Sequence, residues 1–194
     1  MTGKTHITVG VAIGLTLAAG HSLENQATLV LAAAVGSLIP DMDHPRSKIN
    51  QRVLLFKNKV FKMITYSLMG VGLIYLDTIL TNPGVKILRL LGIALILVGL
   101  SRHRSFTHSI LGLALFSAIV YLGTLNYNLY GAFMGFVAGY ISHLVLDLVT
   151  VQGIELFFPL RKNIKIPLGI RTSSATEYLI LTSASVYSAF LMLK

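Results

Sequence analysis

The chain has 194 residues, of which 54% are hydrophobic and only 12% are charged, and its formal net charge is +9. Its mean hydropathy is +0.75. A soluble domain usually has about 25% charged residues, so these values exclude a disordered protein, a nucleic-acid-binding tail and an ordinary soluble enzyme. They predict an all-α, polytopic integral membrane protein. The chain has no cysteine, which excludes disulfides and thiolate metal sites.

Seven apolar stretches follow one another along the chain. A helix needs about 20 apolar residues to cross the hydrocarbon core. Five stretches reach or approach this length: 63–80, 87–100, 109–125, 129–149 and 178–193. Two shorter ones, 7–20 and 27–39, precede them and cross only if polar flanks extend them. We predict a helical bundle of about seven membrane segments in one domain, residues 1–194. Two alternatives remain for its start: residues 7–39 as a re-entrant hairpin, or a signal peptide.

Turn-forming and capping residues mark several ends of these stretches. Pro40 and Pro45 end the second stretch, and the Asn-Pro-Gly run at 82–84 and the Asn-Tyr-Asn run at 126–128 predict turns. Ser174 and Glu177 have the spacing of a capping box before the last helix. Glycines at every fourth position, at 10 and 14 and at 131, 135 and 139, predict close helix packing.

Basic residues concentrate in three connections. Most of the lysines and arginines lie in 40–62, 101–108 and 150–177. With seven crossings these connections lie on one side, which the positive-inside rule makes cytoplasmic. The N-terminus is then inside and the C-terminus outside the cell membrane. We expect contact with anionic membrane lipids and none with nucleic acid.

The connection at 150–177 also contains apolar residues. Leu156-Phe157-Phe158-Pro159-Leu160 precedes four basic residues, Arg161, Lys162, Lys165 and Arg171. This interleaving predicts a segment that lies on an anionic leaflet. The alternative is a pure topology signal.

The candidate functional groups fall into four clusters: His6; Asp41 and Asp43; His103, Arg104 and His108; and His143 and Asp147. On the predicted topology all four lie at the cytoplasmic end of the bundle, whereas His21 lies at the far end. Ionisable groups inside a membrane are costly and are usually functional. The convergence predicts one shared polar site.

The residue types in these clusters predict a metal site. His143 and Asp147 are four residues apart, so they share one helix face. Asp41 and Asp43 place two oxygen donors close together after Pro40. Without cysteine, histidine and aspartate suit Zn²⁺, Mn²⁺ or Fe²⁺, so we expect one or more divalent ions, with zinc favoured. Each cluster alone has a structural alternative, such as a solvated turn or a hydrogen-bonded pair. His44 is either a further ligand or a group that faces water.

The four clusters resemble the motifs of the bacterial YdjM-type family of membrane-bound metal-dependent hydrolases. The motifs are Thr5-His6-x-x-x-Gly10, Gly36-Ser37-Leu38-Ile39-Pro40-Asp41-Met42-Asp43-His44-Pro45-x-Ser47, His103-Arg104-Ser105-x-Thr107-His108-Ser109 and Gly139-Tyr140-x-Ser142-His143-Leu144-x-x-Asp147-x-x-Thr150-x-x-Gly153. Ser105 departs from the family's His-Arg-Gly pattern. The resemblance implies a metal-ligand set of His6, Asp41, Asp43, His103, His108, His143 and Asp147. This set is also similar to that of zinc-dependent phospholipase C, which implies phosphoester chemistry.

The favoured function is therefore metal-dependent hydrolysis of a phosphoester or lipid-headgroup bond at the cytoplasmic face. Asp41 or Asp43 would bridge metals or orient the attacking water. His103 or His108, if not a ligand, would protonate the leaving group. Arg102 and Arg104 would hold the phosphate, although Arg104 is equally explained as a positive-inside anchor.

Two other functions use the same residues. The main alternative is a metal-ion or proton-coupled transporter, in which the histidines and aspartates form a pathway. A pathway should have polar groups on both sides of the membrane. Away from the clusters, Asp77 is the one acid deep in a predicted helix. The third alternative is an assembly subunit that binds a metal incidentally.

Overall fold

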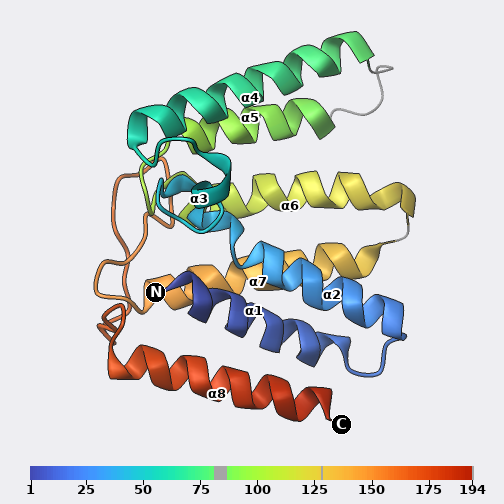
Figure 1. Ribbon diagram of the computed structural model, residues 1–194, viewed down its shortest axis with the longest axis vertical. Helices are drawn as coiled ribbons and strands as arrows, with labels where there is room; N and C mark the ends of the chain where they lie inside the picture. Colours follow the sequence, from blue (N-terminus) through green and yellow to red (C-terminus); the bar gives the residue numbers. More distant parts are fainter. Residues whose placement is uncertain (81–86, 128, 194) are drawn as a thin grey trace.

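The structure, a computed structural model, describes residues 1–80, 87–127 and 129–193. Within these ranges its regular secondary structure is helical, apart from two isolated β-bridges in the segment between α7 and α8 (Figure 1). The long helices are α1 (Gly3–Ala18), α2 (Leu23–Gly36), α4 (Lys59–Leu80), α5 (Ile87–Leu100), α6 (Ile110–Thr124), α7 (Tyr130–Leu148) and α8 (Ala175–Met192). The short ones are η1 (Ile39–Asp43), α3 (Asn50–Val53), η2 (Phe106–His108) and η3 (Leu125–Tyr127).

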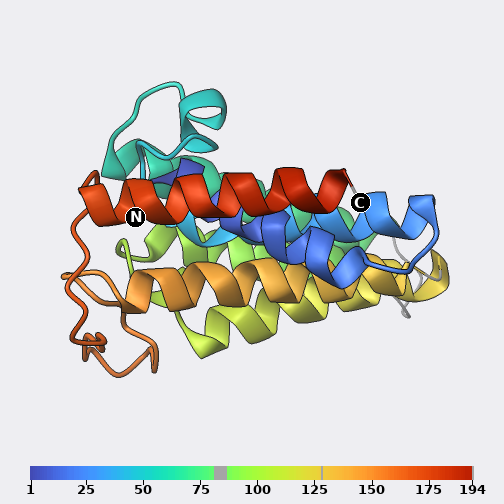
Figure 2. The same cartoon turned by 90° about the horizontal axis from the view of Figure 1, so that it is seen from below.

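The seven long helices lie side by side along one common direction (Figures 1 and 2). α4 packs on α5, α6 on α5 and α7, α2 on α7 and α1, and α1 on α8. Each long helix coincides with one of the seven predicted stretches to within a few residues, so the all-helical fold is confirmed. Within the described residues, two helices are long and apolar enough to cross a membrane, α4 over Lys59–Ile79 and α7 over Tyr130–Leu148. The helices at 87–100 and 110–124 are apolar but shorter.

Glycine packing brings α2 unusually close to α7. A Cβ atom on Gly135 would lie 2.3 Å from the Leu29 carbonyl oxygen, and one on Gly139 would lie 2.0 Å from that of Ala33. A Cβ atom on Gly36 would lie 2.2 Å from the Phe136 carbonyl oxygen. Any larger residue at these positions would push the helices apart. The packing role predicted for the glycines of α7 is confirmed at 135 and 139, and it fixes the end of α2 beside the last turns of α7.

The first turn of α8 is joined to the first turn of α1. Ser174 caps α8 by accepting a hydrogen bond from the Glu177 backbone N–H, as the capping-box spacing predicts. The Glu177 carboxylate accepts from the Thr2 backbone N–H, from the Thr5 hydroxyl and from the Ser173 backbone N–H. The side chain therefore connects two helices. The turn predicted at 82–84, as well as Lys86, Asn128 and Lys194, lies outside the described residues.

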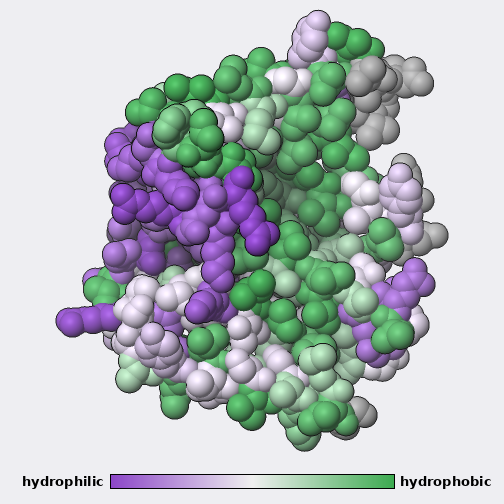
Figure 3. Space-filling view, in the orientation of Figure 1, coloured by the Kyte–Doolittle hydropathy of each residue, from purple (hydrophilic) through white to green (hydrophobic). Residues whose placement is uncertain are grey.

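The predicted polar clusters gather at one end of the bundle. The start of α1, the helices η1 and η2 and the end of α7 all lie at the left in Figure 1, together with the three basic connections. Figure 3 shows hydrophilic surface concentrated at this end. We call it the polar end. The connection between α1 and α2, which contains His21, lies at the opposite end (Figure 1). The predicted convergence is confirmed.

Candidate metal centre

Three fully buried side chains form the first half of the site: His6 on α1, and His143 and Asp147 on α7. We call them the inner triad. His6 Nε2 lies 3.4 Å from Asp147 Oδ1, and His143 Nε2 lies 3.7 Å from Asp147 Oδ2. The two imidazole rings stack with their centroids 3.7 Å apart. The four-residue spacing of His143 and Asp147 puts both on the face of α7 that meets α1.

The histidines of the inner triad present free ring nitrogen atoms to the site. His143 Nδ1 donates a hydrogen bond of 2.7 Å to the Ser37 carbonyl oxygen, which leaves Nε2 as an acceptor that faces the site. Both ring nitrogen atoms of His6 are buried without a hydrogen-bond partner. A buried polar atom without a partner is costly, and coordination of a metal ion would satisfy it.

Three further residues form the second half, which we call the outer triad: Asp41 in η1, His103 in the turn after α5 and His108 in η2. His108 is fully buried, whereas the side chains of Asp41 and His103 are 21% and 35% exposed. This half of the site therefore faces solvent, and the inner triad does not.

The two triads touch. His108 Nε2 lies 3.1 Å from His143 Nε2 and 3.4 Å from Asp147 Oδ2. Asp41 Oδ1 lies 3.8 Å from His143 Nε2 and 3.9 Å from His108 Nε2. The six residues thus form one continuous site.

The spacing of the donor atoms fits a divalent cation. Zinc binds imidazole nitrogen at about 2.0–2.1 Å with tetrahedral geometry, so its ligand atoms lie about 3.3 Å from one another. The nitrogen and oxygen atoms of the site are 3.1–3.9 Å apart. His108 Nε2 and His143 Nε2 face each other at 3.1 Å. Two imidazole nitrogen atoms this close need a proton or a metal cation between them. Geometry and donor chemistry therefore both fit a metal ion.

Asp43, predicted as a ligand, lies behind the outer triad and outside both triads. Its Oδ1 accepts from His103 Nδ1 at 2.8 Å, and its Oδ2 accepts from the Arg104 backbone N–H and the Thr107 hydroxyl. His108 Nδ1 lies 3.3 Å from the same Oδ2. Asp43 thus meets the Nδ1 side of both imidazoles and turns their Nε2 sides toward the site, as carboxylates behind metal-binding histidines commonly do.

Charge at this end of the site is balanced by histidine. Burial alone would raise the pKa of Asp43, but His108 and His103 lower it by more. The net pKa is therefore well below its usual value, and the carboxylate is ionised. Burial lowers the pKa of His108, but Asp43 and Asp147 raise it to about 10. The site therefore favours a positive charge at His108. A metal ion bound there would replace that proton, because a coordinating imidazole must be neutral.

Arg104 lies against the inner triad rather than in the cavity beside Asp41. Its Nη1 donates to the Thr150 hydroxyl and the Gly153 carbonyl, and its Nη2 lies 3.6 Å from Asp147 Oδ2. Its backbone has a positive φ of 67°. These bonds make Arg104 a positioning residue for the end of α7. The amino group of Met1 also lies 2.9 Å from Asp147 Oδ1.

The sequence left the roles of three residues near Arg104 unconfirmed or open: Arg102, Ser105 and His44. Arg102, the other predicted phosphate ligand, is exposed. Ser105 closes its turn by donating to the Arg102 carbonyl, and the left-handed residue of that turn is Arg104. His44 accepts a hydrogen bond from the Arg46 backbone N–H and lies edge-on to His103, outside both triads.

Several residues that support the site were not singled out from the sequence. Lys62 of α4 is buried and donates to the carbonyl oxygens of Asp43, Val98 and Ser101, so it joins η1 to the end of α5. Thr107 binds Asp43, and the Tyr140 hydroxyl donates to the Thr107 carbonyl. Thr107 adjoins His108 in the sequence and could have been inferred from that position. Lys62 had no such signal, because lysines in a basic connection are normally exposed.

Comparison with known proteins places the whole chain in a family context. The sequence profile of the YdjM inner membrane protein family matches residues 1–193. The chain is 30% identical over 192 residues to the uncharacterized protein YvsG of Bacillus subtilis, covering 98% of this chain and 93% of YvsG. It is 26% identical over 142 residues to the inner membrane protein YdjM of Escherichia coli, covering 72% of this chain and 54% of YdjM. No solved structure matches the chain.

Proposed function

This chain belongs to the YdjM inner membrane protein family, and from that membership and the geometry of its site we propose that it is a membrane-bound, metal-dependent hydrolase. The favoured target is a phosphoester or lipid-headgroup bond at the cytoplasmic face. The observation that carries the proposal is the contact between the inner and outer triads at one end of a mostly apolar bundle. Membrane location follows from the family, and the reaction is the proposed part.

The two triads supply the residues that would hold the ion or ions. When bound, a divalent cation acts as a Lewis acid and lowers the pKa of water to about 7. Zn²⁺ fits the donor set best, while Mn²⁺ or Fe²⁺ also accept imidazole and carboxylate. The inner triad would retain the metal, since it is buried and its His143 tautomer is set by the Ser37 carbonyl.

The outer triad would meet the substrate, because Asp41 and His103 are its exposed members. Asp41 would orient the attacking water. His103 either completes the ligand set or holds a proton at Nε2 for the leaving group. Asp43 supports both roles, since it accepts the hydrogen bond from His103 Nδ1 and would stabilise a positive imidazole.

We further propose a multi-pass topology in which all seven long helices cross or enter the inner membrane, with the polar end in the cytoplasm. The basic connections at that end support this orientation by the positive-inside rule. A tag inserted within 46–60 should then be accessible from the cytoplasm, and a reporter fused after the last residue should be accessible from outside. If both report the same side, the seven-crossing topology is wrong.

Metal analysis combined with a hydrolysis assay tests the function. Detergent-purified wild-type protein should contain Zn²⁺, Mn²⁺ or Fe²⁺ and should hydrolyse bis(4-nitrophenyl) phosphate or phosphatidylglycerol. His143→Ala should lose both metal and activity, whereas His21→Ala at the opposite end should retain both. Full metal content and full activity in His143→Ala would refute the proposal.

The transporter alternative is tested in the same preparation. A pathway needs a second polar station away from the polar end, and Asp77 is the predicted candidate. In the structure Asp77 accepts a hydrogen bond of 2.9 Å from Arg89 Nε, an ion pair that joins α4 to α5. Reconstituted vesicles that move metal ions or protons without hydrolysing lipid would favour transport. Bound metal without either activity would favour the assembly subunit.

A further inference from the structure

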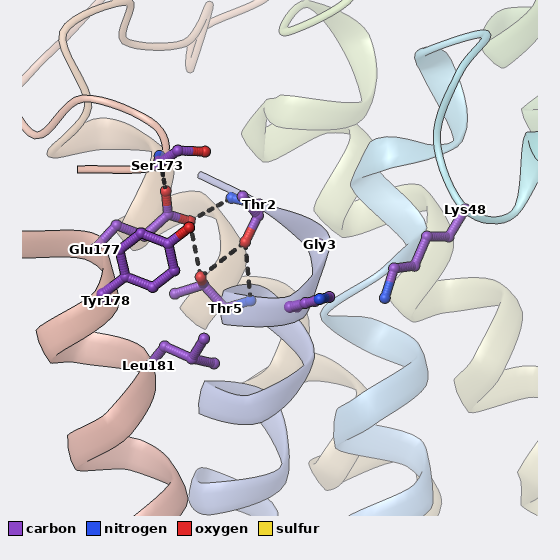
Figure 4. A pocket seen from close by; sticks show the side chains of 9 residues that line it. Thr2, Gly3, Thr5, Lys48, Ser173, Glu177, Tyr178 and Leu181 are labelled. Carbon is purple, nitrogen blue, oxygen red and sulfur yellow. Dashed lines mark hydrogen bonds between the residues drawn. The ribbon is translucent and has the colours of Figure 1, made fainter. Parts of the chain in front are cut away.

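Three cavities meet at Lys48. The first, of about 140 Å³, is lined by Asp41 of the outer triad, by Arg46 and by Lys48. The second, of about 280 Å³, lies between Lys48 and the first turns of α1 and α8 (Figure 4). The third, of about 750 Å³, lies beside α3. Because Lys48 lines all three, they adjoin one another around its side chain. We call the three together the Lys48 cleft, and it reaches the metal centre at Asp41.

The basic groups of the Lys48 cleft are free to bind a ligand. Within the described residues, no hydrogen bond or ion pair involves the Lys48 ammonium or the Arg46 guanidinium, although both face the cavity that contains Asp41. Figure 4 shows the Lys48 side chain extending toward α1. Arg104 differs, since Thr150 and Gly153 already bind its Nη1. An anionic group next to the outer triad would therefore meet Arg46 and Lys48.

One wall of the Lys48 cleft is apolar and continues along α2. Leu38 and Ile49 line both the cavity with Asp41 and the one beside α3. Leu31 and Val35 are four residues apart on one face of α2. Leu38 follows in the turn after the helix, where its backbone N–H donates to the Val35 carbonyl. Leu31 and Val35 are 67% and 52% exposed. Figure 3 shows this face of the molecule hollowed between α4 and α2, with apolar surface along the hollow and hydrophilic surface at the polar end.

We propose that the Lys48 cleft binds an anionic phospholipid. Its phosphate lies between Arg46 and Lys48 beside Asp41, and an acyl chain lies along Leu38 and the outer face of α2. The argument for a lipid, rather than a soluble ester, is that the basic cavity and the apolar face are continuous in an inner membrane protein. Lipid binding stands on this geometry alone, and cleavage of the bound lipid rests on the proposed function.

The chain contains no tryptophan, so one introduced indole reports on a single place. Val35→Trp puts it on the outer face of α2, where the native side chain is half exposed and the larger one has space. In reconstituted vesicles, lipids brominated on the acyl chain quench a tryptophan that they contact. Each basic contact should contribute about 1 kcal/mol of attraction to an anionic lipid, which is about fivefold in occupancy. We therefore expect brominated phosphatidylglycerol to occupy this position more than brominated phosphatidylcholine does, by about fivefold for each basic contact.

Matched variants separate the cleft from the general surface. Val186→Trp on the exposed face of α8 should be quenched equally by both lipids. Adding Arg46→Gln and Lys48→Gln to Val35→Trp should abolish its preference for phosphatidylglycerol, whereas Lys57→Gln and Lys59→Gln, at exposed residues outside the cleft, should leave it in place. Leu31→Trp, one helical turn away, provides a second reporter if Val35→Trp folds poorly. Equal quenching by both lipids at 31 and 35, or a preference that survives loss of Arg46 and Lys48, would overturn the proposal.

Two further measurements distinguish this proposal from the proposed function. If the preference at Val35→Trp persists in protein that binds no metal and hydrolyses nothing, the lipid site stands and the hydrolase fails. If glycerol phosphate displaces the brominated lipid as well as unbrominated phosphatidylglycerol does, the cleft recognises a soluble ester and the lipid proposal is wrong.

Discussion

The inner and outer triads contain the same two residue types in different surroundings. The inner triad is buried between α1 and α7, and a backbone carbonyl fixes the tautomer of His143. The outer triad lies on the short helices η1 and η2 and in the turn between α5 and η2, and two of its members reach solvent. Burial favours retention of an ion, while exposure favours exchange of water and substrate. The difference therefore suggests a division between holding a metal and using it.

The largest effect is expected in the inner triad. His143→Ala and Asp147→Ala should each reduce metal affinity by about 10–100-fold or more, because each removes a buried ligand. The double variant should be little worse than either single one, since both serve one site. Metal content per protein, measured beside membrane insertion, tests this. His21→Ala is the matched control, and strictly additive losses would contradict a shared site.

The next effect is expected at Asp41. Asp41→Asn removes the exposed carboxylate of the outer triad, so hydrolysis should fall about 10–100-fold while the metal held by the inner triad stays. Activity and metal content are measured on the same sample. If Asp41→Asn and Asp147→Asn lose the same amount of metal, the division between the triads is wrong and the six residues act as one site.

A smaller effect is expected behind the outer triad. Asp43→Asn keeps the size of the side chain but removes the charge that orients His103 and His108. Activity should fall about 10-fold or more, again with metal kept in the inner triad. Thr107→Val, which removes one hydrogen bond to Asp43, should have a weaker effect in the same direction. Full activity in Asp43→Asn would show that the histidines need no such support.

The smallest effect is expected on the surface. Neutralising the four basic residues of the segment after α7, Arg161, Lys162, Lys165 and Arg171, should raise the apparent KM for phosphatidylglycerol severalfold, since these charges attract the segment to an anionic membrane but lie outside both triads. The segment has exposed apolar residues among these charges, including Phe157 and Leu160. Metal content should not change in either triad. Unchanged kinetics with unchanged topology would leave these charges as a topology signal alone.

Sequence patterns predicted the helices, because helix ends depend on local spacing. They also predicted the meeting of the clusters, because successive helices of a bundle alternate in direction and bring these segments to the same end. Apolar runs and turn residues set where each helix starts and ends. The family profile confirmed the resemblance inferred from the four motifs. The division into two triads was not predictable, because it depends on how far α2 approaches α7 at Gly135 and Gly139 and on how η1 then turns. That turn puts Asp41 toward the site and Asp43 behind it, although only Met42 separates them.

The positions of two basic residues were also not predictable from the sequence. Arg104 and Lys62 both lie in segments that are rich in basic residues, so their charge alone suggested an interfacial position. In the structure Arg104 instead supports the end of α7, and Lys62 binds three carbonyl oxygens. The last carbonyl groups of a helix have no partner within that helix, but which cation binds them depends on tertiary packing, which the sequence does not show.

The hydrogen bonds of Glu177 affect the order in which the metal centre is assembled during synthesis. All the histidine and aspartate ligands precede α8 in the chain, yet the first turn of α1, which carries His6, is held by the carboxylate of α8 through Thr2 and Thr5. During synthesis the ribosome makes α8 after every ligand. All the ligands are therefore synthesised before the turn that carries His6, the first of them, is held in place by α8. We expect metal loading to be a late step of biogenesis, completed only after α8 has docked on α1.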